Sequence, residues 1–231
     1  MIYDQYDKSK RYLSVDCIIF GYEQEQLKIL LFKRIIEPAI GEWSLIGGWI
    51  KEDESAEQSA RRVLQFITGL SDVYLEQVQT FSKPDRDPGG SVLTVAFNAL
   101  INIEEHSNQL IEKYGAKWFP ISELPNLIFD HNEMLEIAIK KLRLKATYNL
   151  IGRQLLPSKF TITQLRNLYN DIFQKSFDPG NFRKKVLSLK VLKQLDEKDM
   201  SESKKGAYYF KFKDDFESNT VEPIFKNTLK L

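Results

Sequence analysis

The chain has 231 residues, which favours one medium-sized domain followed by a small one. Hydrophobic residues make up 42% and charged residues 28% of a chain with a net charge of +1, a globular composition that excludes disordered and fibrous proteins. The N-terminus is charged and no stretch approaches about 18 apolar residues, so we expect a cytoplasmic protein with no secretory signal and no membrane span.

The chain opens with a predicted β-hairpin. Residues 12–20 and 27–33 are rich in β-branched and apolar residues, and the turn-like segment GYEQEQ separates them. Cys17 lies in the first run and cannot form an internal disulfide, so we interpret it as a strand-core thiol. A glycine-punctuated loop follows. A helix is then predicted from Ser55 to Thr68, with Gly69 as its C-terminal signal.

Further elements complete the first predicted domain, residues 1–150. Strands are expected at 73–81 and 91–101, separated by the loop SKPDRDPGG, and a short strand at AKWFP precedes ISELPNL. Residues 129–148 form an amphipathic pattern that predicts a closing helix. Its apolar stripe comprises Met134, Ile137, Ala138 and Leu142.

Short, strongly capped helices mark the second predicted domain, residues 151–231, which follows the linker-like NLIGRQLLPS. Thr161 and Gln164 have the spacing of a capping box, which predicts a helix to about Gln174. Asp178 and Pro179 predict the start of a second helix. Its core stripe would be Phe182, Val186 and Leu189.

The outer faces of this second helix are basic and polar, as a DNA recognition helix requires. Strands predicted at 191–195 and 207–212 would add a hairpin, giving a winged helix-turn-helix domain. The predicted DNA-binding residues are Thr163, Asn181, Arg183, Lys184, Lys185, Lys204 and Lys205. An ordinary amphipathic helix with a solvated basic face is the alternative.

The distribution of charge supports a polyanionic partner for the second domain. Residues 1–150 hold 17 Lys and Arg against 22 Asp and Glu, a net charge of −5. Residues 151–231 hold 16 against 10, a net charge of +6. A small basic domain is thus attached to a larger acidic one.

A spaced pattern between residues 48 and 70 resembles the Nudix box, a motif of hydrolases that cleave pyrophosphates. The matching positions are Gly48, Glu54, Arg62, Leu64, Gly69 and Leu70. The resemblance implies an α/β fold in which helices sandwich a mixed sheet. In the Nudix family, the glutamate and arginine of the box mainly brace the loop against the helix.

The family's metal-binding glutamates are absent from this sequence. Val63, Phe66 and Ile67 stand in their places, on one helix face at i, i+3 and i+4. None can supply the oxygen ligands that Mg²⁺ requires. Glu52, Asp53 and Glu57 are alternative metal ligands, but exposed carboxylates are ordinary at a helix N-terminus. We therefore predict no catalytic residues, no metal, no cofactor and no hydrolysis.

A Nudix-like domain without a metal would still contain a pocket between the sheet and the glycine loop. Aromatic rings there would stack on a base or sugar, and charged groups would bind hydroxyls or phosphates. The predicted effector-binding residues are Arg34, Trp43, Trp49, Lys51, Arg86, Asp87 and His131. Alternatively, the tryptophans are core residues, Arg34 is a surface ion-pair partner and His131 is structural.

The whole chain resembles the Nudix-related transcription regulators, namely the NrtR-like proteins and their sugar-responsive relatives of the AraR type. The resemblance rests on the Nudix-like segment, DRDP at 85–88, LPNLIFDH at 124–131, and then FTITQLRNLY and FDPGNFRKK. It implies an effector-binding domain and a homodimer whose winged helices bind a palindromic operator in double-stranded DNA.

The missing glutamates favour a sugar effector such as L-arabinose, which would release a repressor from DNA. Three alternatives remain open: a regulator that senses an ADP-ribose-type nucleotide, an active Nudix pyrophosphohydrolase with an appended domain, and an adaptor that does not bind DNA.

Overall fold

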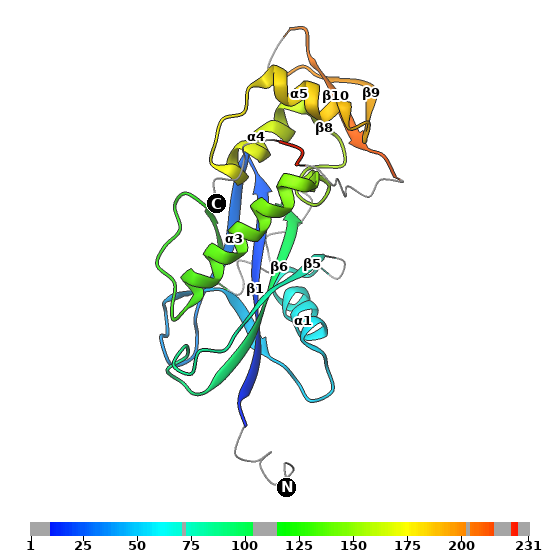
Figure 1. Cartoon of the computed structure of the whole chain (residues 1–231). Coiled ribbons are helices and arrows are strands. Elements are labelled where there is room, and N and C mark those ends of the chain that lie inside the picture. The colour runs from blue at the N-terminus through cyan, green and yellow to red at the C-terminus, as the bar shows by residue number, and fades with distance from the viewer. Residues whose placement is uncertain (1–9, 71–72, 104–114, 202–203, 215–222, 226–231) are drawn as a thin grey trace. The chain divides into compact units, whose positions relative to one another are not determined.

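The computed structural model describes residues 10–70, 73–103, 115–201, 204–214 and 223–225 (Figure 1). They divide into two compact units. Unit 1 lies within residues 1–20, 29–100 and 108–138, and unit 2 within residues 21–28, 101–107 and 139–231. None of the described helices has the length and hydropathy needed to cross a membrane.

One sheet forms the framework of the N-terminal part of the chain. Its strands, among the described residues, are β1 (Tyr12–Glu23), β2 (Gln26–Lys33), β3 (Trp43–Ser44), β4 (Ile46–Trp49), β5 (Tyr74–Phe81), β6 (Val92–Asn102) and β7 (Ala116–Pro120). The order is β3-β2-β1-β6-β5, with β4 also paired to β1 and β7 to β2. The predicted hairpin is confirmed. Its turn is tighter than expected, because Gln24 and Glu25 both adopt positive φ and reverse the chain directly.

Helices α1 (Ala56–Thr68) and α3 (His131–Tyr148) cover the sheet (Figure 1). The Cys17 sulfur lies 3.9 Å from the Ala60 carbonyl oxygen of α1. The neighbouring residue Asp16 points to the opposite face, where His131 begins α3, because side chains alternate along a strand. The predicted α/β fold with a helix-covered sheet is thus confirmed. Cys17 is a buried core thiol, and burial raises its pKa.

Both helices begin and end where local chemistry dictates. Ser55 caps α1 and forms a reciprocal capping box with Gln58, while Gly69 ends the helix at a φ of 76°. The helix expected from residue 129 begins two residues later, because Phe129 has a φ of 51° and cannot be helical.

Unit 2 contains the winged helix that the sequence predicts. It is built from α4 (Ile162–Phe173), α5 (Pro179–Ser188), and a sheet of β8 (Phe160–Thr161), β10 (Ala207–Phe212) and β9 (Leu192–Asp199) in the order β8-β10-β9. The predicted capping box joins Thr161 and Gln164, and Asp178 caps α5. Strand β9 extends further than predicted, to Asp199, while β10 begins at Ala207 as predicted.

The segment interpreted as a linker is part of the core of unit 2, which corrects that prediction. Residues Ile151–Gln154 form the 3₁₀ helix η3, and Ile151, Leu155 and Leu156 are buried. A Cβ atom on Gly152 would lie 2.9 Å from the Leu165 side chain. This glycine therefore allows η3 to pack closely on α4.

The tip of the β1–β2 hairpin also belongs to unit 2. The Leu27 backbone N–H donates to the Asp171 carboxylate of α4 at 2.8 Å, and the Asn167 amide donates to Glu25 at 2.9 Å. Since the compact units follow such contacts rather than one cut in the chain, the domain division at residue 150 stays a prediction.

Candidate functional site

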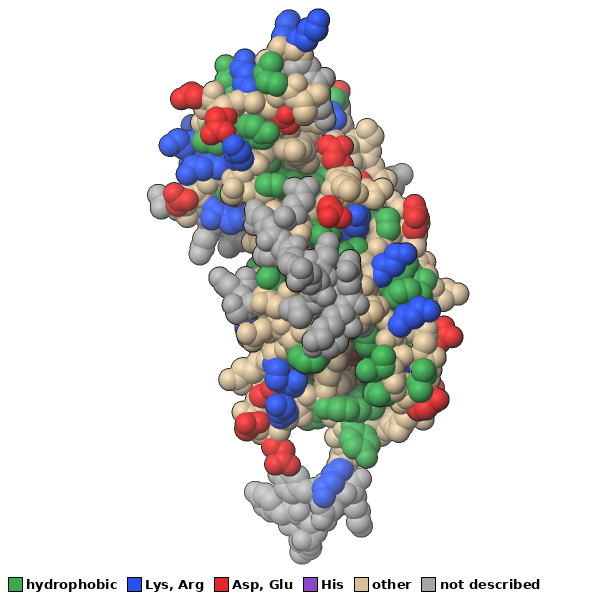
Figure 2. All heavy atoms as spheres, turned by 180° about the vertical axis from the view of Figure 1, so that it is seen from behind, with side chains coloured by type: hydrophobic (Ala, Val, Ile, Leu, Met, Phe, Trp, Pro, Cys, Tyr) green, Lys and Arg blue, Asp and Glu red, His purple; other side chains and the backbone are tan. Residues whose placement is uncertain are grey.

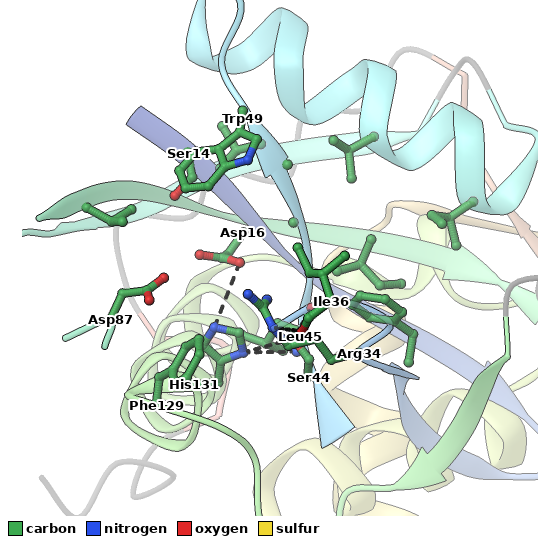
Figure 3. A pocket seen from close by; sticks show the side chains of 18 of the residues that line it. Ser14, Asp16, Arg34, Ile36, Ser44, Leu45, Trp49, Asp87, Phe129 and His131 are labelled. Carbon is green, nitrogen blue, oxygen red and sulfur yellow. Dashed lines mark hydrogen bonds and ion pairs between the residues drawn. The ribbon is translucent and has the colours of Figure 1, made fainter. Parts of the chain in front are cut away.

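A cavity of about 380 Å³ opens within unit 1 (Figure 3). Strands β1, β2 and β4, helix α1, the loop after β5 and the start of α3 contribute its walls. Much of the lining is apolar, including Phe32, Ile36, Ile46, Val63, Ile67 and Phe129. An apolar cavity with a few polar groups is the usual form of a small-molecule site.

The α1 face that replaces the metal-binding glutamates forms one wall of this cavity. Val63 and Ile67 are buried, and Phe66 is 60% exposed. Within the described residues there is no group of three or more His, Cys, Asp or Glu side chains that could hold a metal ion. The hydrocarbon side chains on this face offer no oxygen ligand and therefore do not fit the Mg²⁺ of the hydrolases.

Glu54 and Arg62 join the loop after β4 to helix α1. The Arg62 Nε donates to a Glu54 carboxylate oxygen at 2.9 Å, and its Nη2 donates to the Trp49 carbonyl at 2.9 Å. The hydrogen bond from Arg62 lowers the Glu54 pKa to about 2. Glu54 also accepts from the Lys51 backbone N–H. These contacts are the bracing role that the Nudix resemblance implies.

A buried ion-pair network lies at the cavity wall, to which Arg86 and Asp16 both contribute. Arg86, whose side chain is 2% exposed, donates to both carboxylate oxygens of Asp130 at 2.8 and 2.9 Å. Its Nη2 also lies 3.8 Å from Asp16 Oδ2, which accepts a hydrogen bond from Thr94 at 2.8 Å. The guanidinium of Arg86 is therefore held by protein carboxylates.

His131 joins the same region, and its hydrogen bonds define its tautomer. The Leu45 backbone N–H donates to Nδ1 at 3.1 Å, while the Ser44 hydroxyl donates to the Leu45 carbonyl oxygen at 2.7 Å. Nδ1 is thus an acceptor, and the proton of the neutral ring lies on Nε2, 4.0 Å from Asp16 Oδ1 (Figure 3). Burial lowers the pKa of His131, although Asp16 opposes this shift, so the ring is neutral at neutral pH.

Five of the seven predicted effector-binding residues line the cavity: Arg34, Trp49, Arg86, Asp87 and His131. Trp43 and Lys51 do not. Trp43 packs edge-on against Phe119, with ring centroids 4.8 Å apart, and Lys51 is exposed. That each of the five binds an effector stays a prediction.

Arg34 has a different role from the surface ion pair considered as its alternative. Its Nε donates to the carbonyls of Ile36 and Pro38 at 3.1 and 2.6 Å, and its guanidinium lies 5.3 Å from the Phe129 ring centroid. Across the described part of the chain Arg34 forms no ion pair. Its positive charge at the cavity is therefore not neutralised by a carboxylate.

Sequence reasoning missed Asp16, Ser44 and Phe129 as cavity residues. One signal was present for Asp16, because a carboxylate stands within the otherwise apolar strand segment VDCIIF. Such a buried charge needs partners and often marks a functional position. The other two residues reach the cavity only through tertiary packing.

Most of the predicted DNA-binding residues lie on exposed surfaces of unit 2. Asn181, Arg183 and Lys184 are exposed on α5, where Lys185 is half-buried. Lys204 and Lys205 are exposed in the loop between β9 and β10, and Thr163 is half-buried in the first turn of α4. Figure 2 shows Lys and Arg side chains along the surface of this unit, with Asp and Glu side chains between them.

Comparisons with known proteins identify both parts of the chain. Residues 10–138 match the NUDIX domain family, and residues 152–212 match the NrtR DNA-binding winged helix domain. The chain is 31% identical to the "ADPR responsive transcriptional repressor NtrR" of Acinetobacter baylyi, over 91% of this chain and 85% of that protein. It is also 31% identical to the ADP-ribose pyrophosphatase of Methanocaldococcus jannaschii, over 56% of this chain and 76% of that protein.

A solved structure has the same architecture over nearly the whole chain. NrtR of Shewanella oneidensis, complexed with a 27mer DNA, superimposes with a TM-score of 0.81 and 31% identity, covering 91% of this chain and 98% of that one. The comparisons support the NrtR-like part of the predicted resemblance and give no support to the sugar-responsive AraR-type branch. The chain belongs to the NrtR-like transcription regulators, which join a Nudix domain to a DNA-binding winged helix domain, and it is not a catalytic enzyme.

Proposed function

We propose that this regulator is a repressor that binds operator DNA through unit 2 and is controlled by an ADP-ribose-type nucleotide bound in the cavity of unit 1. The observation that carries the proposal is an NrtR-type winged helix in one chain with a Nudix cavity whose metal-binding face is apolar. The relative from Acinetobacter baylyi, described as an ADPR-responsive repressor, supports both the effector class and the direction of regulation.

The cavity offers the kinds of group that a nucleotide needs. Trp49 is 54% exposed at the cavity, and Phe129 adds a second aromatic ring, so both present surfaces on which a base can stack. The guanidinium of Arg34, which forms no ion pair with a carboxylate of the described residues, can bind a phosphate.

The apolar face of α1, from which the sequence analysis inferred a sugar effector, is also compatible with a nucleotide effector. The sequence argument linked a nucleotide to a bound metal and considered only the loss of the metal ligands. Where the three glutamates are present, a diphosphate beside them needs a cation to screen the repulsion. With Val63, Phe66 and Ile67 in those positions, no such repulsion exists. A diphosphate can therefore bind without a metal.

For the DNA side, we propose that α5 enters the major groove and the β9–β10 loop contacts the phosphate backbone. Arg183 or Asn181 reads base edges, while Lys204 and Lys205 bind phosphates. The protein acts as a homodimer, since a palindromic operator requires two symmetry-related reading heads.

The experiment is a thermal-shift assay on the full chain with ADP-ribose or L-arabinose, with and without EDTA. A ligand that binds only the folded state adds about 2.7 kcal/mol of stability at 100 times its Kd. We expect ADP-ribose to raise Tm equally with and without EDTA, and to remain intact when incubated with Mg²⁺. A shift with L-arabinose and none with ADP-ribose would restore the sugar hypothesis, and EDTA-sensitive turnover would restore the hydrolase.

A matched pair of variants locates the nucleotide. Phe66→Glu returns one carboxylate to the α1 face and should weaken ADP-ribose binding by repulsion. Leu144→Glu makes the same change at another exposed apolar residue, on α3, and should leave binding unchanged. Equal effects of the two variants would place the nucleotide elsewhere.

A further inference from the structure

Two polar atoms at the cavity lie near each other without forming a hydrogen bond. Asp16 Oδ1 and His131 Nε2 are 4.0 Å apart, which is too far for a hydrogen bond (Figure 3). Both residues line the cavity, and within the described residues neither atom forms a hydrogen bond. One atom is a donor and the other is an acceptor, since Nε2 carries the ring proton and Oδ1 belongs to a carboxylate.

The surrounding residues hold both atoms in place. Thr94 fixes the other Asp16 oxygen at 2.8 Å, and Leu45 fixes the other histidine nitrogen at 3.1 Å. Gly47 makes room for the carboxylate, because a Cβ atom there would lie 2.4 Å from Asp16 Oδ1. The pair is therefore a rigid and preorganised feature, as a binding subsite requires.

The geometry suits one chemical group, a hydroxyl. A hydroxyl oxygen accepts from one partner and donates to another, and a single oxygen about 2.8 Å from each atom can contact both across this gap. A phosphate does not suit the position, because it cannot donate a proton when ionised and Asp16 repels it. The buried ion pairs leave the local charge negative, as Arg86 stands between Asp16 and Asp130.

We propose that Asp16 and His131 form a subsite that binds a sugar hydroxyl of the effector. His131 Nε2–H donates a hydrogen bond to the hydroxyl oxygen, and Asp16 Oδ1 accepts a hydrogen bond from the hydroxyl. The inference rests on the proposed function, because it names which part of the effector this end of the cavity recognises. It also separates the roles within the site, with Asp16 and His131 for a hydroxyl and Arg34 for a phosphate.

The test is calorimetric titration of the full chain with ADP-ribose and with its mono-deoxy analogues. His131→Asn keeps an acceptor for the Leu45 N–H but removes the donor that faces Asp16, whereas His131→Gln keeps a donor at the far end of the side chain. We expect His131→Asn to weaken ADP-ribose binding about 10-fold, which is about 1.4 kcal/mol, and His131→Gln to restore most of it. Thr94→Val, which frees Asp16, should give an intermediate loss.

The deoxy analogues provide the readout that a purely structural role would not change. One analogue should bind the unmodified protein about 10-fold more weakly than ADP-ribose does. The same analogue and ADP-ribose should bind His131→Asn equally well, because the missing hydroxyl and the missing histidine remove the same contact. Equal losses with both proteins, or unchanged affinity in His131→Asn and Asp16→Asn, would overturn the subsite. A cooperative unfolding transition for each variant, together with retained DNA binding, shows that both units are folded.

The outcomes also distinguish this subsite from the function on which it rests. If ADP-ribose fails to bind the unmodified protein, the proposed effector is wrong. If L-arabinose binds instead, the same cycle with mono-deoxy pentoses decides whether Asp16 and His131 bind its hydroxyl.

Discussion

Replacing Arg86 by methionine should be the most destabilising single change in the buried ion-pair network of Arg86, Asp16 and Asp130. Methionine fills part of the space of the arginine stem but removes the charge that holds Asp130 and Asp16. Both carboxylates are 11% exposed, so they would remain buried without their cation. Removing one partner of a buried pair costs about 3–5 kcal/mol, because the other charge stays desolvated.

Urea unfolding of the full chain, followed by circular dichroism, measures this cost. In thermal unfolding, Tm of a chain of this size falls by about 2–4 °C for each kcal/mol lost, so a loss of about 3 kcal/mol lowers Tm by about 6–12 °C. Arg61→Met is the matched control, since Arg61 pairs with Glu57 on the surface of α1 and should cost less than about 0.5 kcal/mol. A loss below about 1 kcal/mol for Arg86→Met would refute the reasoning.

Three further predictions concern Glu54, His131 and the DNA-binding surface. Because the pKa of Glu54 is lowered from 4.5 to about 2, stability should decline as the pH falls from 4.5 towards 2, and Glu54→Gln should abolish this decline in acid-unfolding curves. The pKa of His131 is lowered below 6.5, so the unfolded chain takes up a proton that the native chain resists. The free energy of unfolding should therefore fall below pH 6.5, and His131→Gln should flatten its pH dependence there. In DNA titrations at several salt concentrations, Lys204→Ala should weaken binding to all DNA sequences alike and reduce the slope of log K against log salt by about one. Arg183→Ala should reduce the free energy of operator binding by about 1–3 kcal/mol and relax specificity at one base position. Unchanged affinity in both variants would exclude these residues from the interface.

The features predicted best from the sequence are those that local chemistry specifies. The capping box at Thr161 and the helix end at Gly69 depend on residues three or four apart, and the structure places each where the pattern indicates. The contact between Phe177 and Phe182, whose ring centroids lie 5.8 Å apart, is likewise local and forms a hydrophobic staple at the start of α5.

The features missed by sequence reasoning depend on contacts between distant segments. The chain around Gly152 contains the polar and proline residues typical of a linker, yet it is buried because Leu165 and Phe212 pack against it. The cavity joins Asp16 to Arg86 and His131, and nothing local to Asp16 indicates which residues will face it. Trp43 was assigned to the cavity by residue type alone and packs elsewhere against Phe119.

The preference for a sugar effector came from an incomplete electrostatic argument. It considered only the loss of metal ligands at Val63, Phe66 and Ile67, and not the loss of their negative charge. Since removing three carboxylates also removes repulsion towards a diphosphate, the same substitutions are compatible with a nucleotide bound without metal. The similarity to an ADPR-responsive repressor favours that interpretation.

Release of DNA by ADP-ribose tests the central claim most directly. The full chain would be bound to a fluorescent duplex selected from a random pool, and ADP-ribose or L-arabinose would be titrated in the presence of EDTA while anisotropy is recorded. The account predicts that ADP-ribose lowers the anisotropy and that DNA in turn weakens ADP-ribose binding by the same factor, because coupling between two sites is reciprocal. An anisotropy that stays unchanged with saturating ADP-ribose, or that falls only with L-arabinose, would contradict it.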